Sequence, residues 1–302
     1  MRSRSRRTGL RLAAVAAIGA LLTAGCSAQE VRQGWMPGEP GLTDKWDITA
    51  NLWVGSWIAA LAVGVLVWGL TIWAVVAYRR RREDTGYPDQ IRYHVPLEIL
   101  YTVVPLMMIG VLFYFTARDQ AAIESLEEEP DVNIEVIGKQ WSWDFNYLDD
   151  DVYESGVQVP LDGSESNEAQ APTLYLPVGQ TVRFTLQARD VIHSFWVPEF
   201  LYKKDLIPGR TNYYQVTPQI TGEFQGKCAE LCGEFHSEML FNVKVVEQEE
   251  YDAYMDELRE RGQTGALPVN LGRVNTETGE QTEDVVGEDR GGQENSESGQ
   301  GD

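Results

Sequence analysis

Two short segments of the chain carry side chains that bind soft transition metals. One segment of twelve residues contains Cys228, Cys232, His236 and Met239, and an upstream segment contains His193. The whole chain has only three histidines and three cysteines, and two of each lie in these segments. Thiolate, imidazole and thioether ligands together favour copper, particularly copper that changes oxidation state. This concentration of scarce ligand types predicts a copper site.

The spacing of these ligands favours a site with two copper ions. Cys-x3-Cys lets two sulfurs converge from one tight loop, Cys-x3-His adds an imidazole, and His-x2-Met adds a weak, soft ligand. A mononuclear blue-copper site uses one cysteine, two histidines and a long axial methionine. The additional cysteine therefore indicates two copper ions bridged by two sulfurs.

The pattern Cys-x-Glu-x-Cys-x3-His-x2-Met, with His-Ser-Phe-Trp-Val-Pro upstream, resembles the dinuclear Cu(A) loop of cytochrome c oxidase subunit II. In that family the two cysteines bridge both copper ions, each histidine binds one of them, and the methionine is a weak ligand. The resemblance also implies that the Glu230 carboxylate reaches a magnesium or manganese ion at the contact with subunit I. The copper ligands that it implies are His193, Cys228, the backbone carbonyl of Glu230, Cys232, His236 and Met239.

Other interpretations of these residues stay open. Cys228 and Cys232 form a structural disulfide if the domain lies outside the cytoplasm and holds no metal. They cycle between dithiol and disulfide if the chain is a copper-delivery or thiol-redox protein. Met239 and His193 favour the copper site over both alternatives. His94 lies at a predicted membrane border, and we interpret it as an interfacial residue rather than a ligand.

Residues 1–25 have the features of a signal peptide. Five arginines precede an apolar run from Leu12 to Leu22. The run ends in Leu-Thr-Ala-Gly-Cys, which resembles a bacterial lipoprotein signal and implies lipidation of Cys26. Thr23 stands where leucine is more usual, so an ordinary signal peptide with an incidental cysteine is the alternative.

The charge of the chain limits its partners. The formal net charge is −21, and removal of the arginine-rich signal makes it more negative still. A chain this acidic does not bind nucleic acid backbones, and its expected partners are cationic. A basic electron donor would be steered towards such a surface, in a salt-dependent way.

Two apolar stretches predict a transmembrane hairpin over residues 51–118. The first stretch, about 26 residues at ~1.5 Å each, is long enough to cross a hydrocarbon core of ~30 Å. The second runs over residues 95–117. Four consecutive arginines lie between them, and the positive-inside rule places the loop 79–94 in the cytoplasm. Both termini and the remaining chain are then outside a bacterial plasma membrane.

Glu98 is the acidic residue within the second span. A carboxylate in a membrane is a functional hypothesis by default, and a snorkelling interfacial side chain is the alternative. The segment Glu-Ile-Leu-Tyr-Thr-Val-Val-Pro resembles the second helix of subunit II. That resemblance implies that Glu98 lies at the entrance of the proton path called the K channel, on the cytoplasmic side. Pro105 within the span is expected to kink the helix.

Residues 119–247 predict an all-β domain. Apolar and polar residues alternate over 132–137 and 181–186, and Pro, Gly and Asn/Asp clusters separate the runs. Ligands on a loop between the last strands predict a Greek-key cupredoxin barrel. We interpret an acidic stretch, 149–172, as a surface insertion. A solvated loop is the favoured interpretation of it, and a docking element for an electron donor is the alternative.

An aromatic stretch begins the β domain. Trp141, Trp143, Phe145 and Tyr147 alternate and therefore share one face of a strand. Three of the four are expected to be core residues. The stretch resembles the segment of subunit II beneath the docking site of the electron donor, which implies that electrons enter through Trp141.

The ends of the mature chain complete the expected organisation. Residues 26–50 form an outer N-terminal segment, and residues 248–262 have helical spacing. Residues 263–302 are acidic and nearly free of large apolar side chains, so we expect them to be disordered.

The sequence thus predicts a two-helix transmembrane hairpin followed by a Greek-key cupredoxin barrel. The resemblance implies that this is a proton-translocating oxidoreductase subunit that accepts electrons from cytochrome c, soluble or membrane-held. It implies further that the electrons pass through two copper ions to haem in subunit I, where oxygen is reduced to water. Other oxidase subunits and membrane lipid are the remaining expected partners. The rival with the same topology is a quinol oxidase subunit II, a branch that generally lacks the copper ligands.

Overall fold

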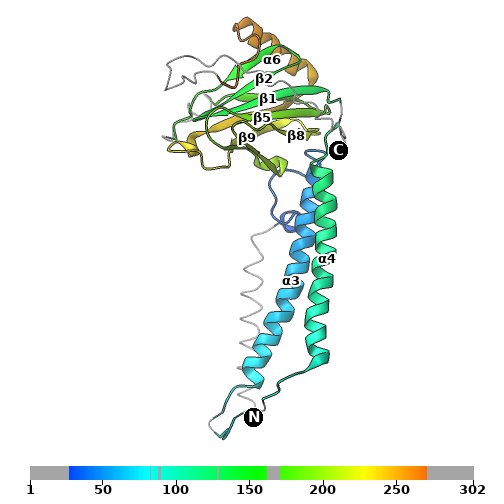
Figure 1. The fold of residues 1–302 in the computed structure, drawn as a ribbon. Helices are drawn as coiled ribbons and strands as arrows, with labels where there is room; N and C mark the ends of the chain where they lie inside the picture. Colours follow the sequence, from blue (N-terminus) through cyan, green and yellow to red (C-terminus); the bar gives the residue numbers. More distant parts are fainter. Residues whose placement is uncertain (1–26, 82, 88–89, 128, 162–170, 271–302) are drawn as a thin grey trace, which may run out of the picture.

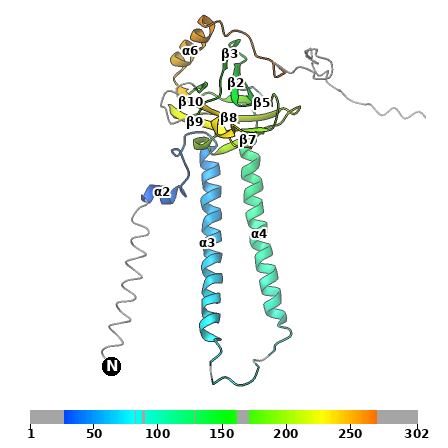
Figure 2. The same cartoon turned by 90° about the vertical axis from the view of Figure 1, so that its left-hand side faces the viewer.

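The computed structural model describes residues 27–270, apart from 82, 88–89, 128 and 162–170. Two long helices stand beneath a two-layered β domain (Figures 1 and 2). The prediction of a two-helix hairpin followed by an all-β domain of the cupredoxin type is confirmed, with the strands divided between two facing sheets.

The long helices are α3 (Trp46–Ala77) and α4 (Val95–Ile123), which pack side by side. Their most apolar windows have mean hydropathies of 2.3 and 2.0, and no residue of either window is buried. A core helix of a soluble domain would be mostly covered, so these exposed apolar surfaces favour a lipid environment. By length and composition, both helices can cross a membrane.

The chain just before α3 fastens the helices to the β domain. Asp44 exchanges two hydrogen bonds with Thr217, one from backbone to backbone at 3.1 Å and one through the Asp44 carboxylate at 2.8 Å. Lys45 donates from Nζ to the carbonyl of Ala122 near the end of α4 at 3.0 Å. Trp46 is buried at the junction. These contacts fix the β domain over the N-terminal end of α3 and the C-terminal end of α4.

Each sheet has five strands, and most neighbours are antiparallel. The parallel pairs, β1 with β5 and β4 with β10, require crossovers between the sheets. In spatial order the first sheet consists of β3 (Val152–Ser155), β2 (Ser142–Tyr147), β1 (Val132–Lys139), β5 (Val182–Ala188) and β8 (Asn212–Val216). The second consists of β4 (Thr173–Pro177), β10 (Leu240–Val246), β9 (Gly222–Cys228), β6 (His193–Val197) and β7 (Tyr202–Leu206).

The core lies between the two sheets and is rich in aromatic rings. Trp143, Phe145 and Tyr147 of β2 are fully buried there, which confirms the expected aromatic face for three of the four residues. A short helix, α2 (Ala28–Arg32), precedes the hairpin. Another, α6 (Gln248–Glu260), follows the last strand and packs on β3 and β4, away from the long helices (Figure 2). Its apolar side is buried, as its helical spacing predicts.

Two stretches expected to be loop or disordered chain are ordered in part. β3 lies within the acidic stretch 149–172 and pairs with β2, so this part belongs to the sheet. Residues 263–270 differ from the expected disordered tail because their backbone is hydrogen-bonded to the first sheet and its loops. Residues 271–302 lie outside the described part of the chain.

Candidate metal centre

The loop between β9 and β10 carries most of the predicted ligands. Cys228 is the last residue of β9, and its N–H donates to the carbonyl of Met239 just before β10 at 3.0 Å. The loop therefore closes on itself, with Cys232 and His236 between these ends. His193 begins β6, which pairs with β9, so the upstream histidine lies beside the loop.

The donor atoms of these residues converge. The two thiol sulfurs are 3.8 Å apart, and His193 Nδ1 lies 3.9 Å from Cys228 Sγ. On the other side of the cluster, Cys232 Sγ lies 3.4 Å from His236 Nδ1 and 3.8 Å from Met239 Sδ. Suitable ligand atoms of His193, Cys228 and Cys232 all lie within 4.8 Å of one another. The structure thus places two sulfurs between two imidazoles, with a thioether at one side.

Glu230 contributes its backbone rather than its side chain to this cluster. Cys228 Sγ lies 3.2 Å from the Glu230 carbonyl oxygen. The Glu230 side chain is exposed at the surface of the loop. The carbonyl can therefore serve the cluster while the carboxylate remains free to meet a partner.

Both cysteines are free thiols in this structure. Their sulfur separation is far longer than the ~2.05 Å of a disulfide bond. Both side chains are buried, at 5% and 4% exposure, and His193 and Met239 are fully buried. A largely buried cluster of two sulfurs, two imidazole nitrogens and a thioether, with only His236 half-buried, fits the soft ligand set of copper.

Asp190 orients the buried imidazole of His193. Asp190 Oδ1 lies 2.7 Å from His193 Nε2, and an ionised carboxylate only accepts, so Nε2 donates this bond. In the neutral ring, Nδ1 is then the acceptor that faces Cys228 Sγ. Gly138 leaves room for the ring, because a Cβ at this position would lie only 2.9 Å from it. Such outer contacts of a histidine ligand fix its tautomer and its orientation.

Without copper, the two thiols of the cluster differ in pKa, lowered for Cys228 and raised for Cys232. Burial alone would lower the pKa of His193, but hydrogen bonds with Asp190 and Cys228 outweigh it and raise that pKa. Burial raises the pKa of the Cys228 thiol, whereas bonds with His193 and nearby backbone groups lower it, and the lowering prevails. Burial and the neighbouring Cys228 raise the pKa of Cys232 to about 12. A metal that binds both sulfurs must therefore displace the Cys232 proton.

Trp141 lies at the rim of this cluster and differs from the other aromatic residues of its stretch. It precedes β2, is half-buried, and packs edge-to-face on Phe235 with ring centroids 4.9 Å apart. Phe235 is the residue before His236. Gly233 allows this approach, since it has a φ of +130° and a Cβ there would crowd the indole at 3.1 Å. Trp141 is thus one aromatic contact away from a predicted ligand.

The remaining predicted sites lie elsewhere. Glu98 is in the first turn of α4, and its Oε1 accepts a hydrogen bond from the backbone N–H of His94 at 2.9 Å. His94 is the residue that caps this helix, and its Nδ1 accepts from Leu97 N at 3.2 Å. Cys26 lies outside the described residues.

Sequence reasoning did not assign roles to Gln140 and Asp190. Gln140 Nε2 donates to the carbonyl of Cys232 at 2.7 Å, and its backbone N–H donates to Asp190 Oδ2 at 2.7 Å. The position of Asp190, three residues before His193, was the signal available for it. Gln140 has no comparable local signal, because its partners are distant in sequence.

The comparisons with known proteins agree with this geometry. The family model described as cytochrome c oxidase subunit II, periplasmic domain, matches residues 132–246. A probable cytochrome c oxidase subunit 2 of Streptomyces avermitilis is 44% identical over 291 residues, covering 86% of this chain and 90% of that protein. Cytochrome c oxidase subunit 2 of Mycobacterium tuberculosis is 35% identical over 310 residues, covering 85% of this chain and 84% of that protein. The chain belongs to the cytochrome c oxidase subunit II family.

A solved structure also matches this subunit II. The periplasmic domain of cytochrome oxidase subunit II of Bradyrhizobium japonicum is 29% identical, with a TM-score of 0.41, and covers 45% of this chain and 99% of that one. As a subunit II, the protein is one part of a haem-copper oxidase and partners subunit I. Its two apolar helices fit a protein of the plasma membrane.

Proposed function

We propose that this subunit II accepts electrons from cytochrome c at a dinuclear Cu(A) centre. It delivers them to haem in subunit I, where oxygen is reduced to water and protons are pumped. The observation that carries this proposal is the convergence of two free thiols, two imidazole Nδ1 atoms and one thioether in a largely buried cluster. Two copper ions held there would accept and release single electrons.

The residues around the pocket keep the ligands in place. The ends of β9 and β10 hold the loop through the bond from Cys228 to Met239, and Asp190 holds His193. Trp143 Nε1 donates to the Met239 carbonyl at 3.3 Å from within the core. A metal site whose ligands change little between oxidation states exchanges electrons with little rearrangement. The rigid sandwich is suited to this task.

Trp141 is the residue through which electrons enter. Its half-buried ring faces solvent on one side and contacts Phe235, next to His236, on the other. A cytochrome c that docks over this edge approaches the cluster through a single aromatic contact. The acidic chain attracts a basic donor to it, whether soluble or membrane-held.

The orientation follows from the arginine-rich loop 79–94. With that loop in the cytoplasm, both termini and the copper domain lie outside. Glu98, at the start of α4, then lies on the cytoplasmic side, where protons enter the K channel. The exposed Glu230 carboxylate faces outward from the loop and binds magnesium or manganese together with subunit I. Lipidation of Cys26 adds a second anchor at the outer surface.

Oxidation of reduced cytochrome c by the purified oxidase tests this proposal. The variant Cys232→Ser removes one bridging sulfur, so we expect assembled complexes with normal haem content that no longer oxidise cytochrome c. Direct chemical reduction of their haem should still support oxygen uptake. A serine variant that oxidises cytochrome c at the rate of the unaltered enzyme would contradict the proposal. Loss of activity in a variant that still binds two copper ions with an unaltered spectrum would instead favour a thiol-redox role.

A further inference from the structure

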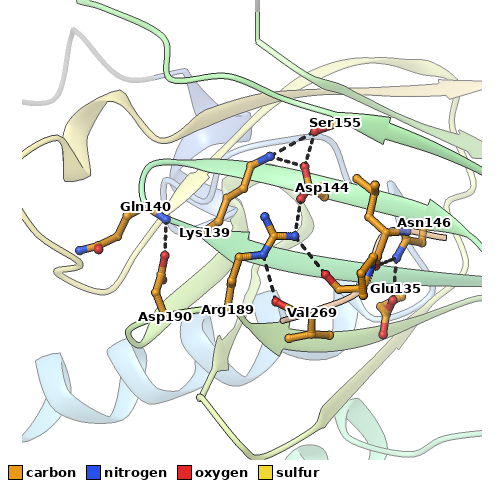
Figure 3. Close-up of polar contacts among 11 residues, drawn as sticks. Glu135, Lys139, Gln140, Asp144, Asn146, Ser155, Arg189, Asp190 and Val269 are labelled. Carbon is orange, nitrogen blue, oxygen red and sulfur yellow. Dashed lines mark hydrogen bonds and ion pairs between the residues drawn. The ribbon is translucent and has the colours of Figure 1, made fainter. Parts of the chain in front are cut away.

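Two polar residues on the outer face of β2 are completely buried. Strand alternation directs Asp144 and Asn146 away from the sandwich core, yet both have 0% exposure. The segment that covers them is residues 264–270, which we name the C-terminal strap. Figure 3 shows these side chains together with Arg189, which donates to the carbonyl of the strap residue Val269. The strap therefore forms an additional layer on the first sheet.

The strap is attached along its length. Thr264 forms a β-bridge with Val152, and Gly265 N–H donates to the Asp151 carbonyl at 2.8 Å. The Asn146 side chain then pairs with the Leu267 backbone in both directions: its Nδ2 donates at 2.9 Å and its Oδ1 accepts at 3.0 Å. Because the Asn146 amide binds both the N–H and the carbonyl of Leu267, it fixes the position of the strap on β2.

Arg189 binds the far end of the strap. Its Nε donates to the Val269 carbonyl at 3.0 Å and one terminal nitrogen donates to Pro268 at 3.3 Å. The same nitrogen binds Asp144 Oδ2 at 3.0 Å, and Lys139 also pairs with Asp144 (Figure 3). The planar guanidinium can hold a carboxylate and two carbonyls together in a fixed arrangement, which a lysine cannot do.

The strand register places this cluster next to the metal centre. β1 and β5 are parallel, and Arg189 N–H donates to the Gly138 carbonyl at 2.9 Å where both strands end. Arg189 is followed by Asp190, and Lys139 is followed by Gln140. The first member of each pair binds Asp144 beneath the strap. The second members bind each other at 2.7 Å through Gln140 N–H and the Asp190 carboxylate.

The second members also reach the metal ligands. Asp190 binds His193, and Gln140 binds the carbonyl of Cys232, each at 2.7 Å. We propose that Arg189 is a positioning residue that couples the C-terminal strap to the copper ligands, so that the closed strap holds both His193 and the cysteine loop in register. The redox part of this inference rests on the proposed function. The mechanical coupling is a property of the copper-free chain and is tested without metal.

The test compares two truncations of the full-length chain in detergent. A stop after Gln263 removes the strap but keeps the end of α6, where Gln263 N–H bonds Leu258. A stop after Asn270 keeps the strap and is the matched control. Without copper, alkylation of Cys228 and Cys232 by iodoacetamide, followed by peptide mass spectrometry, reports opening of the pocket.

We expect the chain ending at Gln263 to be alkylated roughly tenfold faster than the control, the change that ~1.4 kcal/mol of lost restraint produces. With copper bound, its hyperfine splitting and midpoint potential should also differ from those of the control. Equal alkylation rates together with equal spectra would overturn the coupling. Two bound copper ions in both chains would in that case leave the proposed function intact.

Three point variants in the coupling and one control variant keep the test decisive if the shortened chain does not fold. Asn146→Ala removes the contacts with Leu267 and loosens the strap at a point away from Arg189. Arg189→Gln removes the guanidinium that binds the strap at Pro268 and Val269. Both variants should speed alkylation of the two cysteines. Arg189→Lys should be alkylated nearly as fast as Arg189→Gln, because lysine retains the charge but not the planar set of donors of the guanidinium. Leu174→Ala, a core truncation in β4, lowers stability without touching the strap. If Leu174→Ala speeds alkylation as much as an Asn146 or Arg189 variant of equal stability, the proposed coupling is wrong.

The double variant isolates the coupling itself. If Arg189 acts through the strap, combining Arg189→Gln with the stop after Gln263 should add little to either change alone. Fully additive effects on alkylation and on the copper spectrum would show that the two parts act independently, and would overturn the proposal.

Discussion

Gln140 Nε2 donates a hydrogen bond of 2.7 Å to the backbone carbonyl of Cys232, although 92 positions separate the two residues. This bond joins the hairpin that carries Trp141 to the centre of the cysteine loop. The backbone N–H of the same residue binds Asp190, which holds His193. One residue thus connects the proposed site of electron arrival with ligands on both sides of the cluster.

Replacement of Gln140 tests this connection. Gln140→Ala removes one hydrogen bond, worth about 1 kcal/mol, and should leave the copper content unchanged. Gln140→Glu should be more damaging, because an ionised carboxylate cannot donate and would face the Cys232 carbonyl. We expect the rate of electron transfer from cytochrome c to copper, measured by stopped-flow absorbance, to fall from the unaltered protein to Gln140→Ala and to be lowest in Gln140→Glu. Equal rates in all three proteins would show that the bond has no role in electron transfer.

Asp190→Asn is expected to weaken copper binding. The carboxylate accepts from His193, from Gln140 N–H and from Val191 N–H, each at 2.7 Å, and an amide cannot accept all three equally. Loss of the partner of a ligating histidine typically costs ~10–100-fold in metal affinity. Titration against a competing chelator measures the change. Asp205→Asn, at a surface ion pair with Lys203, is the control and should bind copper normally.

Glu154 makes the stability of the β domain depend on pH. Burial raises the pKa of this carboxyl above its ordinary value of 4.5, and the nearby Arg261 only partly offsets the rise. The folded state therefore binds this proton more tightly than the unfolded state. The stability that this provides is complete below pH 4.5 and is lost as pH rises through the folded pKa.

Glu154→Gln should remove this dependence, because the amide does not ionise. We expect the melting temperature of the variant, relative to the unaltered protein, to rise from acidic to neutral pH. Thermal unfolding followed by tryptophan fluorescence in a pH series measures the difference. A difference that is constant across the series would show that Glu154 does not titrate differently on folding.

The parts of the structure that local pattern determines could be predicted from the sequence. Hydropathy identifies α3 and α4, alternation identifies the aromatic face of β2, and ligand spacing brings Cys228, Cys232 and His236 together on one loop. These features depend on residues close to one another in the chain.

The supporting contacts of the site could not be predicted in the same way. Gln140 and Asp190 meet because β1 and β5 run parallel in a particular register, and no local pattern reports that register. The strap is short and rich in small residues, and no local pattern in it predicts helix or strand. It is ordered because Asn146 and Arg189, far away in sequence, satisfy its backbone groups. Long-range polar contacts therefore decide its state.

In the proposed centre, this subunit holds two copper ions that share one unpaired electron. The most direct test is electron paramagnetic resonance of the purified full-length chain loaded with copper, together with the copper stoichiometry. We predict two copper ions per chain and a seven-line hyperfine pattern, since one unpaired electron is shared by two copper nuclei. A single copper ion with a four-line pattern, or a folded chain that binds no copper tightly, would contradict it.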